Sequence, residues 1–139
     1  NNLMPSIIKT YGLIKAVESF CDKINKTNKL SISFETENID ERIDENLELI
    51  LFRVITELIN NTLKHANANK IFIMLIKNED KLSLYFKDDG VGFIVDDILN
   101  SNKGMGLKNI ISRVKSINGK YFFNSILNEG FTIRIEVNI

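Results

Sequence analysis

The chain has 139 residues, enough for one domain with a real core, and its 18 basic and 18 acidic side chains give a formal net charge of +0. This balance offers no general electrostatic attraction for nucleic acid or an anionic membrane, so we expect contact with neither. Cys21 is the only cysteine, which excludes an intrachain disulfide and favours a reducing compartment. The chain begins at Asn1 rather than Met, and we therefore expect it to be a piece of a longer protein.

The first half of the chain has the pattern of two helices and one strand. Apolar residues recur at three- and four-residue steps from Pro5 to about Lys26, which is typical of a helix. The alternating run Leu30 to Glu35 predicts a strand. Asp44 is a suitable N-cap for a long helix from about Glu45 to Ala66, which the cluster Asn67 to Asn69 ends.

The second half of the chain predicts four more strands and a third helix. In order, these are strands over 70–77 and 81–87, a loop over 90–103, a helix over 106–117 and strands over 121–127 and 131–137. Five strands and three helices indicate the α+β class. We expect a two-layer α/β sandwich, in which a mixed sheet of about five strands is covered on one face by three helices.

The long helix predicted over 45–66 carries a polar edge beside its buried stripe. At about 100° per residue, the stripe consists of Leu47, Leu51, Val54 and Leu58. Glu57, Asn61 and Lys64 fall along one flank of this stripe, within roughly 60° of one another. Asn60 lies roughly 170° from the centre of the stripe, so we expect Asn60 to face water and Asn61 to border the core.

These side chains suit a metal-bound phosphate group. The amide oxygen of Asn61 is a ligand of the kind that Mg²⁺ accepts, and Lys64 would add positive charge one turn along. His65, the only histidine, projects near the apolar stripe, and we expect it to pack there or to contact phosphate rather than to accept a phosphoryl group. The alternative is a surface helix with an ordinary polar pair and a solvated lysine, which the motifs further along the chain make less favourable.

A strand that ends in an acidic glycine turn follows. Alternation places four of its side chains on one face: Leu82, Leu84, Phe86 and Asp88. Asp88 should therefore lie at the mouth of the core, while Asp89 points outward. A buried carboxylate requires a hydrogen-bond donor, and the amino group of adenine would be one. Gly90 and Gly92 allow a sharp turn and the close approach of a flat base, although a turn of this kind is common in proteins.

A glycine-rich helix start is the third segment, and it consists of Gly104, Met105, Gly106 and Leu107. The free N–H groups at such a helix start favour phosphate, and Lys103 could add positive charge. A dinucleotide-binding fingerprint would require a glycine where Asn109 stands and a strand before the motif. Both are missing from the pattern, so a Rossmann site is excluded.

Taken in this order, the three segments resemble the ATP-binding domain of the superfamily that groups DNA gyrase, heat-shock chaperone, histidine kinase and mismatch-repair ATPases. Within it, the chain is similar to bacterial sensor histidine kinases. Arg53 to Ala66 resembles the N box of that family, Asp88 to Phe93 its first glycine box and Lys103 to Ile110 its second. Leu3 to Leu13 is similar to the join between the dimerisation helices and the ATP domain in the subclass that acts on LuxR-type regulators.

The resemblance implies an ATP-binding fold of the Bergerat type over 13–139, preceded by the end of the dimerisation-domain connector over 1–12. It also implies roles for the site residues: Asn61 would coordinate Mg²⁺, Lys64 and His65 would contact phosphates and Asp88 would bind adenine. The residues expected to hold the nucleotide are Asn61, Lys64, His65, Asp88, Gly90, Gly92, Lys103, Gly104, Met105, Gly106 and Leu107, with Glu57 and Asn61 as catalytic residues. Glu57 lies where gyrase-like relatives keep the glutamate that activates water.

The chain departs from the family pattern in two places. Relatives often carry a threonine after the glycine near the last strand, where it helps to hold adenine through water. Here Phe131 follows Gly130 and should point inward, while Thr132 should point outward, so Thr132 is not assigned to the site. The chain also contains no phosphoacceptor histidine with a flanking acidic residue.

These features predict the catalytic ATP-binding domain of a sensor histidine kinase, which binds Mg·ATP and donates the γ-phosphate to a histidine on another domain. Its expected partners are the dimerisation domain of the same kinase and a downstream response regulator. The parent protein is expected to be a homodimer, with this domain in the cytoplasm and with or without an inner-membrane anchor. The alternatives are an anti-sigma-factor-like serine kinase with the same pocket and a non-catalytic nucleotide-binding interaction module.

Overall fold

The alternating apolar segments of the chain pair into one five-stranded sheet. The computed structural model describes residues 4–92 and 105–139. Its strands are β1 (Ser31–Glu37), β2 (Lys70–Asn78), β3 (Lys81–Asp88), β4 (Lys120–Ile126) and β5 (Gly130–Asn138). They lie in the order β1-β2-β3-β5-β4, with β1 parallel to β2 and every other pair antiparallel, so the sheet is mixed as predicted.

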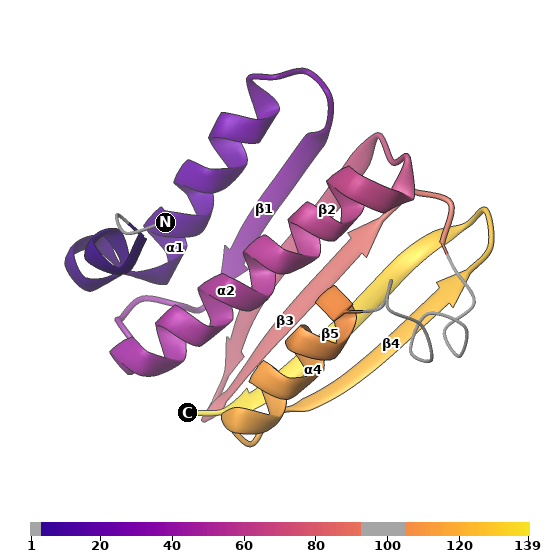
Figure 1. The fold of residues 1–139 in the computed structure, drawn as a ribbon. Helices are drawn as coiled ribbons and strands as arrows, with labels where there is room; N and C mark the ends of the chain where they lie inside the picture. Colours follow the sequence, from indigo (N-terminus) through magenta and orange to yellow (C-terminus); the bar gives the residue numbers. More distant parts are fainter. Residues whose placement is uncertain (1–3, 93–104) are drawn as a thin grey trace.

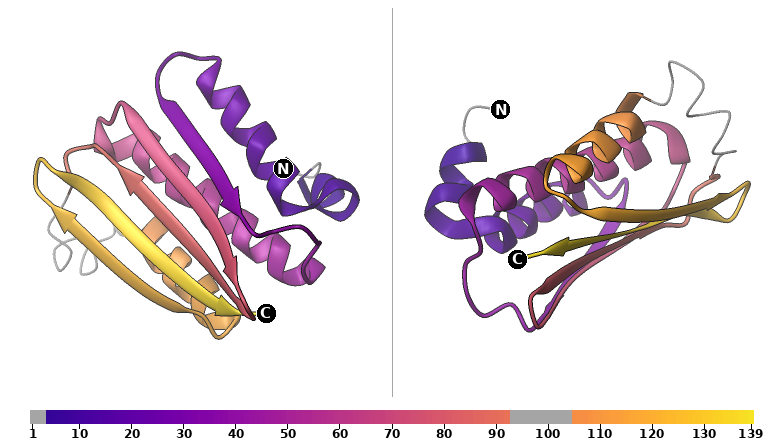
Figure 2. Two further views of the ribbon diagram at one scale, coloured as in Figure 1. Left: turned by 180° about the vertical axis from the view of Figure 1, so that it is seen from behind. Right: turned by 90° about the horizontal axis from the view of Figure 1, so that it is seen from below.

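The helices form a second layer on one face of this sheet. They are α1 (Met4–Asn25), α2 (Glu45–Asn61) with the π-helical turn η1 (Thr62–Ala66), and α4 (Met105–Ser116). Figure 2 shows the two layers from the side, with all of these helices above the sheet. The predicted α+β sandwich is therefore confirmed. Within the described ranges, no helix is long and apolar enough to cross a bilayer.

The core lies between the sheet and the helices α1, α2 and α4. The predicted inward residues of β3 are all buried, and so is the predicted stripe of α2, which consists of Leu47, Leu51, Val54 and Leu58. The buried face of α2 is wider than predicted, because Ile55 and Ile59 are also buried. The reason is that α2 lies between α1 and α4 and contacts both (Figure 1). Asn60 is half-buried, as Asn61 is, so the prediction that only Asn60 of the two faces water was wrong.

The start of α2 and the end of η1 follow from local signals in the sequence. At the start, Asp44 caps the helix as predicted, because its carboxylate accepts a hydrogen bond from the backbone N–H of Leu47 at 3.0 Å. At the other end the regular α-helix stops at Asn61 and continues as the wider π turn η1, which the sequence did not predict. Asn67 then takes a left-handed conformation, with φ of 49°, and ends the helix at the predicted place.

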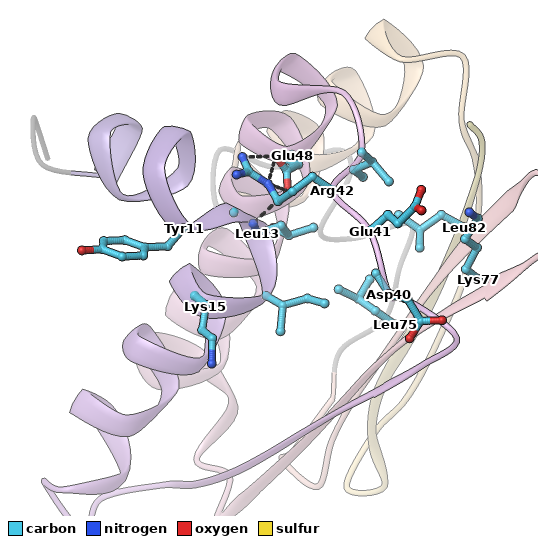
Figure 3. A pocket seen from close by; sticks show the side chains of 14 residues that line it. Tyr11, Leu13, Lys15, Asp40, Glu41, Arg42, Glu48, Leu75, Lys77 and Leu82 are labelled. Carbon is cyan, nitrogen blue, oxygen red and sulfur yellow. Dashed lines mark hydrogen bonds and ion pairs between the residues drawn. The ribbon is translucent and has the colours of Figure 1, made fainter.

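The predicted helix over 5–26 is not continuous, because α1 breaks at Gly12. Its φ of 89° and ψ of 175° are non-helical and lie in a region that favours glycine. The side chain of Arg42 packs against the break, and it donates to the carbonyl oxygen of Ile8 at 2.8 Å. On the other side of the break, the carboxylate of Glu48 accepts from the backbone N–H of Leu13 at 3.0 Å. Figure 3 shows Arg42 and Glu48 joined beside Leu13.

Candidate functional site

Asp88 is the last residue of β3, and it carries a buried carboxylate at the end of the middle strand of the sheet. Only 3% of the residue is exposed, which confirms the predicted inward orientation. Its Oδ1 accepts hydrogen bonds from the backbone N–H groups of Gly90 at 3.0 Å and Phe131 at 3.1 Å. Its Oδ2 accepts from the hydroxyl of Thr62 at 2.9 Å. Neutral protein donors therefore stabilise the carboxylate in a place where burial alone would be costly.

Asp89 points to the outside, as predicted, and has a structural role. It is exposed, and its Oδ1 accepts from the backbone N–H groups of Asn69 at 2.8 Å and Lys70 at 2.9 Å. Burial acts to raise the pKa of Asp89, but the hydrogen bonds from Lys70 and Asn69 together hold that pKa below its ordinary value. Asp89 thus ties the segment that leaves η1 to the end of β3.

Gly92 of the acidic turn and Gly130 at the start of β5 mark a close approach between this turn and the hairpin formed by β4 and β5. Gly92 has a φ of 65°, and a Cβ atom at this position would collide with the carbonyl oxygen of Ile126. Gly130 has a φ of 102°, and a Cβ atom there would collide with the carbonyl oxygen of Asp88. Phe131 is buried, as expected, while Thr132 is half-buried and its hydroxyl donates to the carbonyl oxygen of Asn124. Glycine is therefore required at positions 92 and 130 for packing, whatever the turn binds.

The polar edge of α2 meets the start of α4 at Gly106. A Cβ atom at position 106 would lie 2.5 Å from Oδ1 of Asn61 and 2.9 Å from Oε1 of Glu57. These separations are far shorter than a normal contact, so a residue larger than glycine at position 106 would displace the ends of both side chains from their present positions. Glu57 and Asn61 are half-buried, which agrees with their predicted position at the border of the core. The tertiary structure therefore brings two of the three predicted segments into contact.

Lys64 and His65 both belong to η1, and their side chains are exposed. The expectation that His65 projects near the apolar stripe was wrong. The projection assumed about 100° per residue, which applies to an α-helix but not to a π turn, where each turn contains more residues. Contact of either side chain with phosphate stays a prediction.

The remaining predicted residues lie at the start of α4 or before it. Leu107 is buried, so its side chain belongs to the core and only its backbone could contact a ligand. Met105 is the first residue of α4, and Lys103 and Gly104 lie outside the described residues. No group of three acidic, histidine or cysteine side chains in the described part of the chain could hold a metal ion. A metal here would need few protein ligands, as Mg²⁺ beside phosphates does.

Thr62 is the site residue that the sequence analysis missed. It is 4% exposed, and its hydroxyl is the only side-chain donor to Asp88 among the described residues. A signal was present, because Thr62 follows Leu58 by four residues and so continues the buried stripe. A polar residue in that position requires a buried partner.

A mixed sheet covered by helices on one face, with a buried aspartate at the end of its middle strand, is the arrangement of a nucleotide-binding α/β sandwich. The family model of histidine kinase-, DNA gyrase B-, and HSP90-like ATPases matches residues 46–139, and the chain belongs to this family. It is 30% identical over 139 residues to sensor histidine kinase ComP of Bacillus subtilis (strain 168). It is 29% identical over 137 residues to oxygen sensor histidine kinase NreB of Staphylococcus carnosus (strain TM300).

These matches cover almost the whole chain but only part of each relative. The match with ComP covers 100% of this chain and 18% of ComP. The match with NreB covers 99% of this chain and 39% of NreB. Among solved structures, the catalytic domain of histidine kinase ThkA has a TM-score of 0.71 at 21% identity, covering 91% of this chain and 89% of that one. This likeness shows that the two chains share a fold.

Proposed function

We propose that this chain is the catalytic domain of a sensor histidine kinase, which binds Mg·ATP and delivers the γ-phosphate to a histidine on a separate dimerisation domain. The observation that carries the proposal is the Asp88 carboxylate. It is buried at the end of β3, where three neutral donors bond to it, and none of the ion pairs among the described residues includes it. Such a carboxylate is suited to accept a hydrogen bond from the amino group of adenine.

The phosphates would lie at the junction of α2, η1 and α4. Asn61 would hold Mg²⁺ through its amide oxygen, and the close contact between Gly106 and Asn61 supports this fit, because any larger residue at 106 would occupy the place of the amide. Bound Mg²⁺ would neutralise phosphate charge. Lys64 and His65 are exposed on η1 and would contact phosphate oxygens. Glu57, beside Asn61, would accept a hydrogen bond from water at this junction.

The start of α4 would bind the triphosphate through its backbone. Gly106 and Leu107 lie in the first turn of α4, where N–H groups have no partner within the helix. We assign Lys103, Gly104 and Met105 to the same role on the basis of the motif, and Gly90 and Gly92 to the turn beside adenine. In this arrangement the protein acts by positioning and charge neutralisation, as is usual in phosphoryl transfer.

The break in α1 marks the proposed domain boundary. Residues 1–12 would end the connector from the dimerisation domain, and residues 13–139 would form the ATP-binding domain. Gly12, where the helix breaks, falls at this boundary. The partners would be that dimerisation domain and a response regulator of the LuxR type, in a homodimeric parent protein whose ATP-binding domain is cytoplasmic.

Two neighbouring aspartates provide a matched test of nucleotide binding. In calorimetric titration with Mg·ATP, Asp88→Asn should weaken binding at least about tenfold, since a hydrogen bond to a charged group contributes about 1.5–3 kcal/mol. Asp89→Asn removes the same charge from an exposed position and should change the affinity less than about twofold. Equal effects of the two variants would remove the assignment of Asp88. No heat with the unaltered chain would contradict the proposal and favour a non-catalytic interaction module that does not bind Mg·ATP.

Phosphoryl transfer requires a second measurement. With γ-labelled ATP the isolated chain should not label itself, whereas addition of the parent protein's dimerisation domain should give acid-labile phosphohistidine on that domain. His65→Gln should leave this pattern in place if His65 is not a phosphoacceptor. Phosphohistidine on the isolated chain would contradict the proposal, and acid-stable phosphoserine on a partner would favour the anti-sigma-factor-like serine kinase.

A further inference from the structure

The hydroxyl of Thr62 is held between two acceptors in the interior of the protein. It lies 2.9 Å from Oδ2 of Asp88 and 3.2 Å from the carbonyl oxygen of Leu58. A hydroxyl group has one proton to donate, and a carboxylate is the stronger acceptor as well as the nearer one here. The proton of Thr62 therefore points to Asp88.

The hydrogen bonds of Asp88 within the described residues fill three of the acceptor positions of its carboxylate and leave one position for a further donor. A carboxylate offers about four acceptor positions, two on each oxygen. The backbone N–H groups of Gly90 and Phe131 occupy both positions on Oδ1. Thr62 occupies one position on Oδ2, and no other donor in the described part of the chain reaches that oxygen. The remaining acceptor position is on Oδ2, and Thr62 sets its orientation.

We propose that Thr62 is a positioning residue that makes the Asp88 carboxylate selective for a 6-aminopurine nucleotide. The inference rests on the proposed function, in which Asp88 faces the nucleobase. With Oδ1 fixed by the backbone and Oδ2 fixed by Thr62, the one acceptor position left can receive a single N–H group. A purine with an amino group at position 6 supplies that donor, and a purine without it leaves the carboxylate unmatched.

This role differs from simple stabilisation of the helix end. Threonine hydroxyls often bond to the carbonyl oxygen of residue i−4, and Thr62 could serve only that purpose through Leu58. Helix α2 offers a comparison, because among the described residues the hydroxyl of Thr56 bonds to no group other than the backbone carbonyl oxygen of Arg53, at 3.1 Å. Removal of the Thr56 hydroxyl changes a helix contact alone, whereas removal of the Thr62 hydroxyl also releases Oδ2 of Asp88.

The test combines a change in the protein with a change in the ligand. Calorimetry would measure the affinity of the unaltered chain, Thr62→Val, Thr62→Ser and Thr56→Val for ATP and for purine riboside triphosphate, which lacks the 6-amino group. The unaltered chain should prefer ATP about tenfold or more. Thr62→Val should lose most of this preference by weakening ATP about tenfold and the analogue less than about twofold. Thr62→Ser and Thr56→Val should keep the preference.

Each outcome decides the proposal. Equal weakening of both ligands by Thr62→Val, or an unchanged preference, would overturn it and leave Thr62 with a structural role. If Thr62→Val does not fold, Thr62→Ala removes the same hydroxyl without adding a methyl group and is judged by the same ratio. Failure of the unaltered chain to bind ATP would instead refute the proposed function. Binding of ATP without any preference over the analogue would overturn the role of Asp88 at the nucleobase and, with it, that of Thr62.

Discussion

Arg42 and Glu48 form an ion pair that joins the two halves of α1 across its break. Nη2 of Arg42 donates to Oε1 of Glu48 at 2.7 Å, and Nε lies 3.1 Å from both carboxylate oxygens. Glu48 is 2% exposed, and the other hydrogen-bond partner of its carboxylate among the described residues is the backbone N–H of Leu13. Arg42 also donates to the carbonyl oxygen of Ile8. The pair therefore satisfies the backbone on both sides of Gly12.

Replacement of Arg42 should destabilise the fold, because it leaves the carboxylate of Glu48 buried without a cation. We expect Arg42→Gln to lower the midpoint of thermal unfolding by several degrees, and Arg42→Gln combined with Glu48→Gln to recover part of the loss. Lys15→Gln is the control, since the ion pair of Lys15 with Glu18 is exposed. A loss no larger than that of the control would contradict this role.

The contribution of Arg42 to the free energy of unfolding should be the same at neutral and at moderately alkaline pH. Its hydrogen bond with Glu48 is the main cause that raises the pKa of Arg42 above its ordinary value, against the opposing effect of desolvation. A raised pKa in the folded state means that the stability is present at every pH below the pKa of the unfolded chain. The difference in unfolding free energy between the unaltered chain and Arg42→Gln should therefore be the same at about pH 7 and about pH 10.

Asp89 should stabilise the protein at neutral pH and lose this effect in acid. The pKa of Asp89 is lowered in the folded state, so its contribution is present above the unfolded value of about 3.9 and disappears as the pH falls through the lower, folded value. Urea unfolding should show that Asp89→Asn is less stable than the unaltered chain at about pH 7, with the difference shrinking towards about pH 3. A constant difference would show that the charge of Asp89 is not involved.

Gly106→Ala should separate nucleotide binding from stability. The added Cβ atom would displace the ends of the Asn61 and Glu57 side chains, which can rotate away, while alanine favours the helix by roughly 1 kcal/mol relative to glycine. The thermal midpoint should stay the same or rise, and the affinity for Mg·ATP should fall on the order of tenfold, the loss of about one charged contact. A lower midpoint with unchanged affinity would mean that the junction does not bind the nucleotide.

The adjacent asparagines should differ in their effect on metal dependence. Asn61→Ala removes the proposed ligand of Mg²⁺, and ATP affinity should then respond little to the addition of Mg²⁺ or of a chelator. Asn60→Ala alters a half-buried amide of the same helix without a proposed ligand role, so the metal dependence of ATP binding should remain. Titrations with and without Mg²⁺ measure both. The same metal dependence in the two variants would exclude Asn61 as the ligand.

Cys21 should be inert in the folded protein. It is 3% exposed, and burial together with nearby Asp22 and Glu18 raises the pKa of the thiol to about 12. Because the thiolate is the reactive form, labelling by a thiol reagent at about pH 8 should be slow in buffer and fast in urea. Fast labelling of the folded chain, with the single thiol reacting before unfolding, would show that α1 opens readily.

Local patterns in the sequence were sufficient to predict much of this protein. The periodicity of apolar residues placed the helices and strands, the Asp44 cap and the inward orientation of Asp88, because each depends on neighbours a few residues away. The order of the asparagine and glycine motifs along the chain indicated the family. These predictions hold in the folded protein because the sheet and the helices bury the apolar faces that the periodicity indicates.

Tertiary packing decided the features that no local pattern contains. The hydroxyl of Thr62 meets Asp88 across 26 residues, and the carboxylate of Glu48 meets Leu13 across 35. At the break in α1 the side chain of Arg42 packs against Gly12, and His65 is exposed in the π turn that follows α2. Such contacts depend on how separate helices and strands pack against one another. The amino-acid sequence supplies the side chains, and only the tertiary structure determines which of them come into contact.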